Sequence, residues 1–281
     1  MSEGEAAPAG TTPGSSNLVM RVVVALVLAP LTIALAYAGG WMWSGLVTLA
    51  SIGLYVEWLM VVGASRQVAL TASGIIALAV IGLSLGFGWI NLAFLIVVLG
   101  CAWIVLLAEG KRVWAAAGFL YASAALIASV LMRQDSAKGF SALMFVLLVV
   151  WASDIGGYVA GRSIGGPKLW PRVSPKKTWA GALGGFGASL AVAAGFAALD
   201  LGRTVPLVLL SAVLSVVSQC GDLFESAVKR RFGVKDSSHL IPGHGGLMDR
   251  LDGFIAAIVV ASIFGFLRRG VDGVGSGLMV W

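Results

Sequence analysis

Long apolar segments alternate with short polar segments along almost the whole chain. Nine apolar runs of roughly 20 residues follow one another from residue 22 onward, and this is the length that an α-helix needs to cross a bilayer. The runs lack the period of two that is typical of membrane-barrel strands. The pattern therefore predicts an all-α integral membrane protein with about nine transmembrane helices. We expect these helices at about 22–38, 41–63, 68–87, 89–108, 113–132, 141–161, 178–199, 204–228 and 249–267.

Two long polar loops, at residues 162–177 and 229–248, interrupt the second half of this pattern. The other connections are short, so we divide the chain into four parts. These are a disordered polar tail (1–16), about five N-terminal transmembrane helices (17–140), a transmembrane region that holds both polar loops (141–268) and a short C-terminal tail (269–281).

The composition agrees with a membrane protein. Hydrophobic residues make up 59% of the chain, charged residues make up 11%, and the mean hydropathy is +0.96. A soluble domain is closer to about one quarter charged. Cys101 and Cys220 both lie inside apolar runs, so we expect no disulfide framework. The formal net charge of +6 suits contact with anionic lipid or with a phosphorylated ligand and does not distinguish between them.

The distribution of Lys and Arg predicts the orientation of the chain. Nine spans would leave 14 of the 19 Lys and Arg residues on the side of the N-terminus and of both long loops. The five on the opposite side would be Arg133, Lys138, Arg203, Arg268 and Arg269. Because cytoplasmic loops are enriched in Lys and Arg, we expect a multi-pass protein of the cell inner membrane with both polar loops in the cytoplasm.

The polar chemistry is concentrated in residues 226–252. This stretch contains five basic residues, three acids and both histidines of the chain, between two apolar helices. Gly245 and Gly246 would let the backbone approach a ligand closely. His239 and His244 have no cysteine nearby and do not indicate zinc, and His244 is better suited to contact a phosphate or a base. The Gly-x-x-x-x-Gly-Lys-Ser/Thr sequence of a P-loop is absent.

Acids within the predicted helices are further candidates. The eighth helix carries a polar stripe at steps of three or four, made of Ser211, Ser215, Ser218, Asp222, Ser226 and Lys229. Serines in such a stripe are typical of helix packing, whereas an intramembrane carboxylate is costly unless it is paired or binds a cation. Asp249 begins the ninth helix, so Asp222 and Asp249 could face each other and bind Mg²⁺. Ion pairs with Arg230 and Arg250 are the alternative.

Two other features leave their roles open. Lys176 and Lys177 stand where the seventh helix is expected to begin, so they could bind an anion together with the first amides of that helix. They could equally be a cytoplasmic topology anchor. Glu57, in the second helix, is another intramembrane acid, and the sequence assigns it no role.

One long motif runs through residues 226–252. It consists of Ser226, Lys229-Arg230, Lys235-Asp236, His244-Gly245-Gly246, Asp249-Arg250 and Asp252. In these residues and in their spacing, the chain closely resembles the signature of the phosphatidate cytidylyltransferases, also called CDP-diacylglycerol synthases. The segment Ser174–Gly181 and the pair Asp154 and Tyr158 match the same family, although Gly157 stands where Ala is usual. The resemblance is strong over about 150–265 and only general over the first five helices.

The resemblance implies an enzyme of phospholipid biosynthesis that makes CDP-diacylglycerol and pyrophosphate from CTP and phosphatidic acid with Mg²⁺. It implies a catalytic region at 141–268, a membrane-embedded homodimer and no nucleic-acid partner. Asp222 and Asp249 would hold Mg²⁺, with room for a second cation, and would be catalytic together with Lys229 and Arg250. The residues that would contact substrate are Lys176, Lys177, Ser226, Arg230, Lys235, Asp236, His244, Gly245, Gly246, Asp252 and Asp154.

Three other functions are alternatives to this one, and the sequence disfavours one of them. A transporter for an anionic solute would also combine intramembrane acids with basic loops, but the two halves show no internal repeat and the polar residues gather at one end. A cytidylyltransferase for another lipid phosphate, such as an ether lipid, would share the motif. A CDP-alcohol phosphotransferase is disfavoured, because its Asp-Gly-x-x-Ala-Arg motif is absent and Asp252-Gly253 is followed by other residues.

Overall fold

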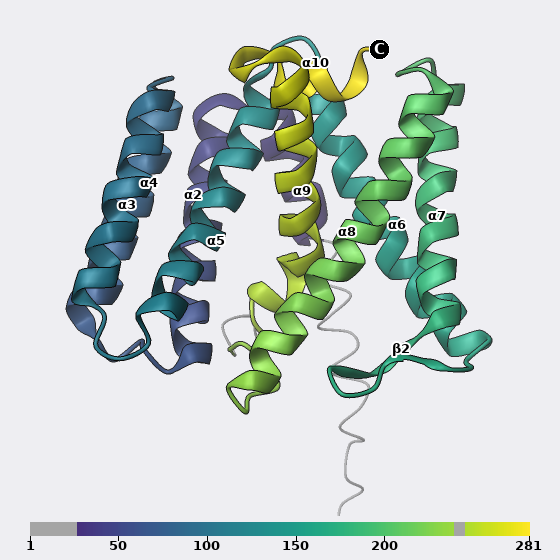
Figure 1. The fold of residues 1–281 in the computed structure, drawn as a ribbon. Helices are drawn as coiled ribbons and strands as arrows, with labels where there is room; N and C mark the ends of the chain where they lie inside the picture. The colour runs from purple at the N-terminus through teal and green to yellow at the C-terminus, as the bar shows by residue number, and fades with distance from the viewer. Residues whose placement is uncertain (1–26, 239–244) are drawn as a thin grey trace, which may run out of the picture.

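The computed structural model describes residues 27–238 and 245–281, which form a bundle of long helices (Figure 1). Eight helices are long and apolar enough to cross a membrane. They are α2 (Gly40–Val62), α3 (Val68–Gly86), α4 (Ile90–Leu107), α5 (Arg112–Gln134), α6 (Gly139–Ser163), α7 (Trp179–Ala198), α8 (Thr204–Arg231) and α9 (Met248–Arg269). The first expected helix begins outside the described residues, and its described part, Val27–Ala38, is helical. The class of an all-α membrane protein is therefore confirmed, and the ninth span stays a prediction.

The polar loop at 162–177 contains a small β-hairpin that the sequence analysis did not predict. Strand β1 (Lys168–Trp170) pairs antiparallel with β2 (Ser174–Thr178), and Lys168 lies opposite Thr178. The hairpin lies at the lower end of the bundle in Figure 1, beside the first turn of α7. Thr178 caps α7, because its hydroxyl accepts a hydrogen bond from the Gly181 amide at 3.1 Å. Lys176 and Lys177 therefore lie on β2 and not in the helix itself.

Residues 271–279, within the segment expected to be a short C-terminal tail, are helical. A 3₁₀ turn, η1 (Val271–Gly273), leads into the short helix α10 (Val274–Met279), which packs against α9 and α6. The side chains of Val274 and Leu278 are fully buried there. Gly275 and Gly277 allow this contact, because a Cβ on Gly275 would lie 2.7 Å from the Gly139 Cα atom and a Cβ on Gly277 would overlap the Gly265 backbone.

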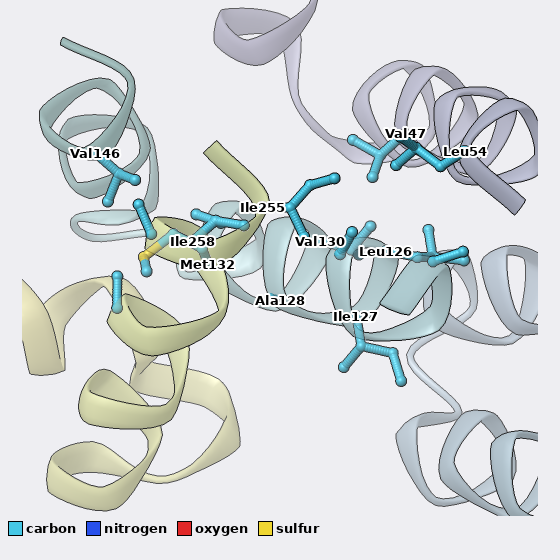
Figure 2. Close-up of a cluster of buried hydrophobic side chains, with 14 of the residues drawn as sticks. Val47, Leu54, Leu126, Ile127, Ala128, Val130, Met132, Val146, Ile255 and Ile258 are labelled. Carbon is cyan, nitrogen blue, oxygen red and sulfur yellow. The ribbon is translucent and has the colours of Figure 1, made fainter. Parts of the chain in front are cut away.

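The bundle is organised around α5. Of an 18-residue apolar stretch of α5, 78% is buried inside the protein. The corresponding value for α4 is 11%, so α4 lies at the periphery together with α3 (Figure 1). Figure 2 shows how Leu126 and Val130 of α5 lie between Val47 and Leu54 of α2 on one side and Ile255 of α9 on the other. This apolar contact fixes α2 and α9 relative to each other.

Helices α6 and α7 pack through small residues. A Cβ on Gly184 would overlap the Ala160 side chain, and a Cβ on Gly156 would lie 2.6 Å from the Ala188 Cβ atom. A Cβ on Gly181 would lie 2.9 Å from the carbonyl oxygen of Gly157. Small residues at such a contact let two membrane helices approach closely. The approach places the last turns of α6 directly beside β2 and the beginning of α7.

Candidate active site

Polar side chains from α6, β2, α8 and α9 line one cavity of about 700 Å³ at the hairpin end of the bundle. This volume lies within the range of roughly 300–1,000 Å³ that is typical of ligand sites. The charged lining residues are Asp154, Arg162, Lys176, Lys177, Asp222, Glu225, Lys229, Asp249, Arg250 and Asp252. Most of the residues that the sequence selected for chemistry therefore meet at this cavity, although they come from four separate elements.

The polar stripe of α8 serves two purposes. Its first part packs helices together, since the Ser211 hydroxyl donates to the Ser189 carbonyl at 2.6 Å and the Ser215 and Ser153 hydroxyls lie 3.2 Å apart. All of these serines are buried. The last two turns of α8 face the cavity instead. The two interpretations of the stripe therefore apply to different turns of the same helix.

Lys229 is the central cation of the site. Only 8% of this residue is exposed. Its ammonium group lies 2.8 Å from a Glu225 carboxylate oxygen and also forms an ion pair with Asp249. A buried ammonium group needs such partners, because unpaired burial of a charge is strongly unfavourable. The two carboxylates therefore hold Lys229 in one position at the wall of the cavity.

The second carboxylate oxygen of Asp249 binds the loop that precedes α9. It accepts hydrogen bonds from the Ser237 amide at 3.1 Å, the Ser237 hydroxyl at 3.0 Å and the Gly246 amide at 3.1 Å. Gly245 has a φ of 82°, a conformation that is natural only for glycine, and a Cβ there would lie 3.3 Å from Asp249. Asp249, in the first turn of α9, therefore links Lys229 of α8 to the loop that precedes α9.

Asp222 is paired with a residue of the hairpin. Its carboxylate forms an ion pair with Lys177 of β2, and the Ser226 hydroxyl lies 3.4 Å from its other oxygen. The side chains of Lys177 and Asp222 are 27% and 33% exposed, so a ligand in the cavity can reach both. Each of the two candidate acids therefore has a lysine as an ion-pair partner.

Several predicted site residues lie elsewhere. Arg230, Lys235 and Asp236 are exposed and do not line the cavity, and an Arg230 guanidinium nitrogen donates to the Val234 carbonyl at 3.2 Å. His244 lies outside the described residues. Contact of these four residues with substrate stays a prediction.

Glu225 is a lining residue that the sequence analysis missed. It is only 2% exposed, and its Oε1 atom has no hydrogen-bond partner among the described residues. Its place in the sequence was a usable signal, because it stands three residues after Asp222 and four before Lys229, on the face that carries the chemistry.

The charges of the cavity bear on the question of a metal ion. Five acids and five bases line it, so the formal charge of the lining sums to zero. The carboxylate of Asp252 lies close enough to those of Asp154, Asp222 and Glu225 to be repelled by them. Among the described residues, no group of three or more His, Cys, Asp or Glu side chains is arranged to hold a metal by itself. The donor set fits a cation that takes a few protein oxygens and completes its shell with ligand oxygens, as Mg²⁺ commonly does.

Comparisons with known proteins agree with the motif. The sequence model of the family described as "Cytidylyltransferase family" matches residues 19–267. Proteins named phosphatidate cytidylyltransferase from Brucella suis biovar 1 and from Brucella abortus are each 40% identical over 264 residues, which cover 89% of this chain and 94% of the relative. A protein of the same name from Haemophilus influenzae is 43% identical over 138 residues, or 47% of this chain and 48% of the relative.

Proposed function

Because the chain belongs to the cytidylyltransferase family, we propose that its polar cavity is the place where CTP and phosphatidic acid react. The chain transfers the cytidylyl group of CTP to phosphatidic acid, which gives CDP-diacylglycerol and pyrophosphate for phospholipid biosynthesis. One observation supports the location above all. All three segments that resemble the family contribute lining residues to the same cavity: the pair Asp154 and Tyr158, the segment Ser174–Gly181 and the motif within 226–252.

The reaction needs charge neutralisation more than it needs a base. The lipid phosphate is already ionised, so one of its oxygens can attack the α-phosphorus of CTP directly. A P–O bond forms there while the bond from the same phosphorus to the pyrophosphate oxygen breaks. Catalysis of such transfers rests mainly on positioning and on preorganised charge. Lys229, fixed between Glu225 and Asp249, supplies a cation that does not have to reorganise during the reaction.

The remaining bases contact phosphate oxygens in this proposal. Lys176, Lys177 and Arg250 all line the cavity. Lysine acts on phosphate as a point charge, whereas the arginine fork can bind two oxygens at once. Lys177 forms an ion pair with Asp222, so phosphate binding would offer its ammonium group a second anionic partner.

We propose Asp222 and Asp249 as the residues that hold Mg²⁺. A lining with no net formal charge cannot compensate a triphosphate and a lipid phosphate by itself, so an additional cation is needed. Bound there, Mg²⁺ would supply positive charge that offsets the charge of the departing pyrophosphate. Asp154 and Asp252 interact electrostatically with Asp222, and they would be the ligands of a second cation.

The same proposal covers sidedness and assembly. The cavity lies at the end of the bundle that carries the hairpin and the loop before α9, and segments 162–177 and 229–248 hold nine of the 19 Lys and Arg residues. The positive-inside rule then places this end in the cytoplasm, where CTP is available.

A cysteine introduced at position 236 tests this orientation, because position 236 is exposed, whereas the neighbouring position 237 is buried. Labelling by an impermeant reagent only after the membrane is opened is expected, and labelling of intact cells would contradict it. A homodimer is expected from the family resemblance.

The direct test is incubation of the purified protein with CTP labelled in the cytidine and with Mg²⁺ and phosphatidic acid. We expect a labelled lipid and one pyrophosphate for each lipid formed. Reactions without phosphatidic acid are the control, and an ether-linked phosphatidate in a parallel reaction measures the preference for the lipid. Uptake of a phosphorylated solute into proteoliposomes, with no labelled lipid, would instead support the transporter.

A further inference from the structure

Glu57 is a fully buried carboxylate in the helices for which the resemblance implies no function. It lies on α2 with 0% of the residue exposed. Its Oε1 atom accepts hydrogen bonds from the Ser238 hydroxyl at 2.6 Å and the Leu247 amide at 2.8 Å. Its Oε2 atom accepts from the Ser237 hydroxyl at 3.1 Å and the Met248 amide at 2.7 Å. These donors lie in the segment that follows α8 and at the first residue of α9.

This arrangement fixes the beginning of α9. Leu247 and Met248 stand at the N-terminus of that helix, where backbone amides lack partners within the helix. Side chains usually satisfy such amides from within the same segment. Here the acceptor comes from another helix, 190 residues away from Leu247 in sequence. Glu57 therefore ties the N-terminal helices to the first turn that carries Asp249.

A second link runs from Glu57 to Asp249 itself. The Ser237 hydroxyl lies 3.1 Å from Glu57 Oε2 and 3.0 Å from Asp249 Oδ2. A hydroxyl has one proton, so it donates to one of the two carboxylates at a time. The Ser237 amide also donates to Asp249 at 3.1 Å. Contacts therefore run from Glu57 through Ser237 to Asp249 and on to Lys229 at the cavity wall.

The contact between Glu57 and Ser237 leaves no space for a side chain at position 246. A Cβ on Gly246 would overlap the Ser237 hydroxyl and would lie 2.7 Å from Glu57 Oε2. The second glycine of the His-Gly-Gly motif is therefore required by Glu57 and Ser237, whatever it does with a substrate. An amide in place of the Glu57 carboxylate would turn an NH₂ group toward groups that are themselves donors.

We propose that Glu57 is a positioning residue for the transfer reaction, a role that rests on the function proposed above. By holding Ser237 and the start of α9, it fixes the orientation in which Asp249 and Lys229 face the cavity. Glu57 does not line the cavity and is not expected to touch either substrate. Its effect should therefore appear in turnover more than in substrate binding.

The experiment compares Glu57→Gln, Glu57→Asp and Ser237→Ala with the wild type. Ser51→Ala is the matched control, because Ser51 is buried on the same helix and its hydroxyl has no hydrogen-bond partner in the part of the chain that the structure describes. For Glu57→Gln we expect kcat to fall by at least about tenfold, since small displacements of reacting groups are costly, while KM for CTP changes by less than about threefold. Glu57→Asp, which keeps the charge, should recover part of the loss.

Ser237→Ala keeps both carboxylates, so it tests the role of the link between Glu57 and Asp249 if Glu57→Gln does not fold. It should lower kcat to a smaller extent, and the double variant should lose no more than Glu57→Gln alone, because both act through the same hydroxyl. Hydrogen exchange at the Leu247 and Met248 amides should accelerate in Glu57→Gln and stay unchanged in Ser51→Ala.

Three results would overturn the proposal. Folded Glu57→Gln and Ser237→Ala proteins with wild-type kcat and KM would show that the link has no role in turnover. A loss of activity that matches the loss of folded protein would leave Glu57 as a packing residue only. Failure of the wild type and of Ser51→Ala to form labelled lipid would remove the proposed function itself, and the positioning role with it.

Discussion

Lys177 of the hairpin and Asp222 of α8 form an ion pair at the cavity, although one residue comes from the polar loop 162–177 and the other from a membrane helix. Each side chain keeps about a third of its surface exposed, which distinguishes this pair from the buried pair of Lys229 with Asp249. The strength of an ion pair depends on its solvent exposure, so the two acids should respond differently to substitution.

Asp222→Asn and Asp249→Asn should each lower kcat by roughly a hundredfold or more, because several kcal/mol of metal-based stabilisation is lost. Their stabilities should differ. Asp222→Asn loses a partly exposed ion pair and should unfold almost like the wild type. Asp249→Asn leaves Lys229 with one carboxylate and should lower the melting temperature clearly. Near-normal turnover of both variants at limiting Mg²⁺ would falsify the assignment of the metal ligands.

Replacement of Lys176 and Lys177 by Gln should raise the apparent KM for CTP or for phosphatidic acid, with each phosphate contact contributing about 1–3 kcal/mol. Because Lys177 is also paired with Asp222, the single variants separate the two effects. Steady-state rates with each substrate varied in turn provide the measurement. Kinetics equal to the wild type in both single variants would mean that the lysines only anchor the topology.

Gly184→Ala should destabilise the protein, because its new Cβ would overlap the Ala160 side chain in the contact between α6 and α7. Overpacking of this kind costs about 1–3 kcal/mol. Gly187→Ala on the same helix is the control, since nothing lies within 4 Å of a Cβ there. Thermal unfolding in detergent should separate the two variants. Equal melting temperatures would show that α6 and α7 can move apart without cost.

The stability of the protein should fall at acidic pH partly through Asp135, which lies between α5 and α6. Burial alone would raise the pKa of Asp135, but the Ser276, Lys138 and Ala137 amides donate hydrogen bonds to its carboxylate and lower the pKa below its ordinary value. Asp135 therefore stabilises the folded state fully above its unfolded pKa of about 3.9. This contribution is lost as the pH falls through the lower folded value.

Asp135→Asn should accordingly melt below the wild type at pH 7, and the difference should shrink as the pH is lowered below about 4. The exposed acid Asp272, at the same end of the bundle, provides the control variant Asp272→Asn. A gap between wild type and Asp135→Asn that stays constant over this range would contradict the assignment.

The sequence predicted the parts of the structure that depend on local patterns. Apolar runs of membrane-spanning length located the helices, since helix length follows directly from bilayer thickness. Asp222 and Lys229 were found because steps of three and four put them on one helix face. The hairpin was missed, because strands of three and five residues within a polar loop have too few positions to show an alternation.

Other features depend on contacts that no local pattern contains. Glu57 was visible as an intramembrane acid, but its partners are 180 to 191 residues away and are brought to it only by the packing of α2 against α5 and α9. The same holds for α10. Its sequence resembles a Gly-rich tail, because the contacts of Gly275 and Gly277 with other parts of the backbone leave no local pattern.

The glycine-lined contact between α6 and α7 bears on the order in which the protein is assembled during synthesis. These two helices bury their small-residue faces against each other, and a short hairpin joins them. A pair of this kind can associate in the bilayer as soon as both helices have left the ribosome and entered the membrane, before α8 and α9 exist. Asp154 and Lys177 would then already be in place, and Asp222, Lys229 and Asp249 would dock onto a prebuilt half of the cavity.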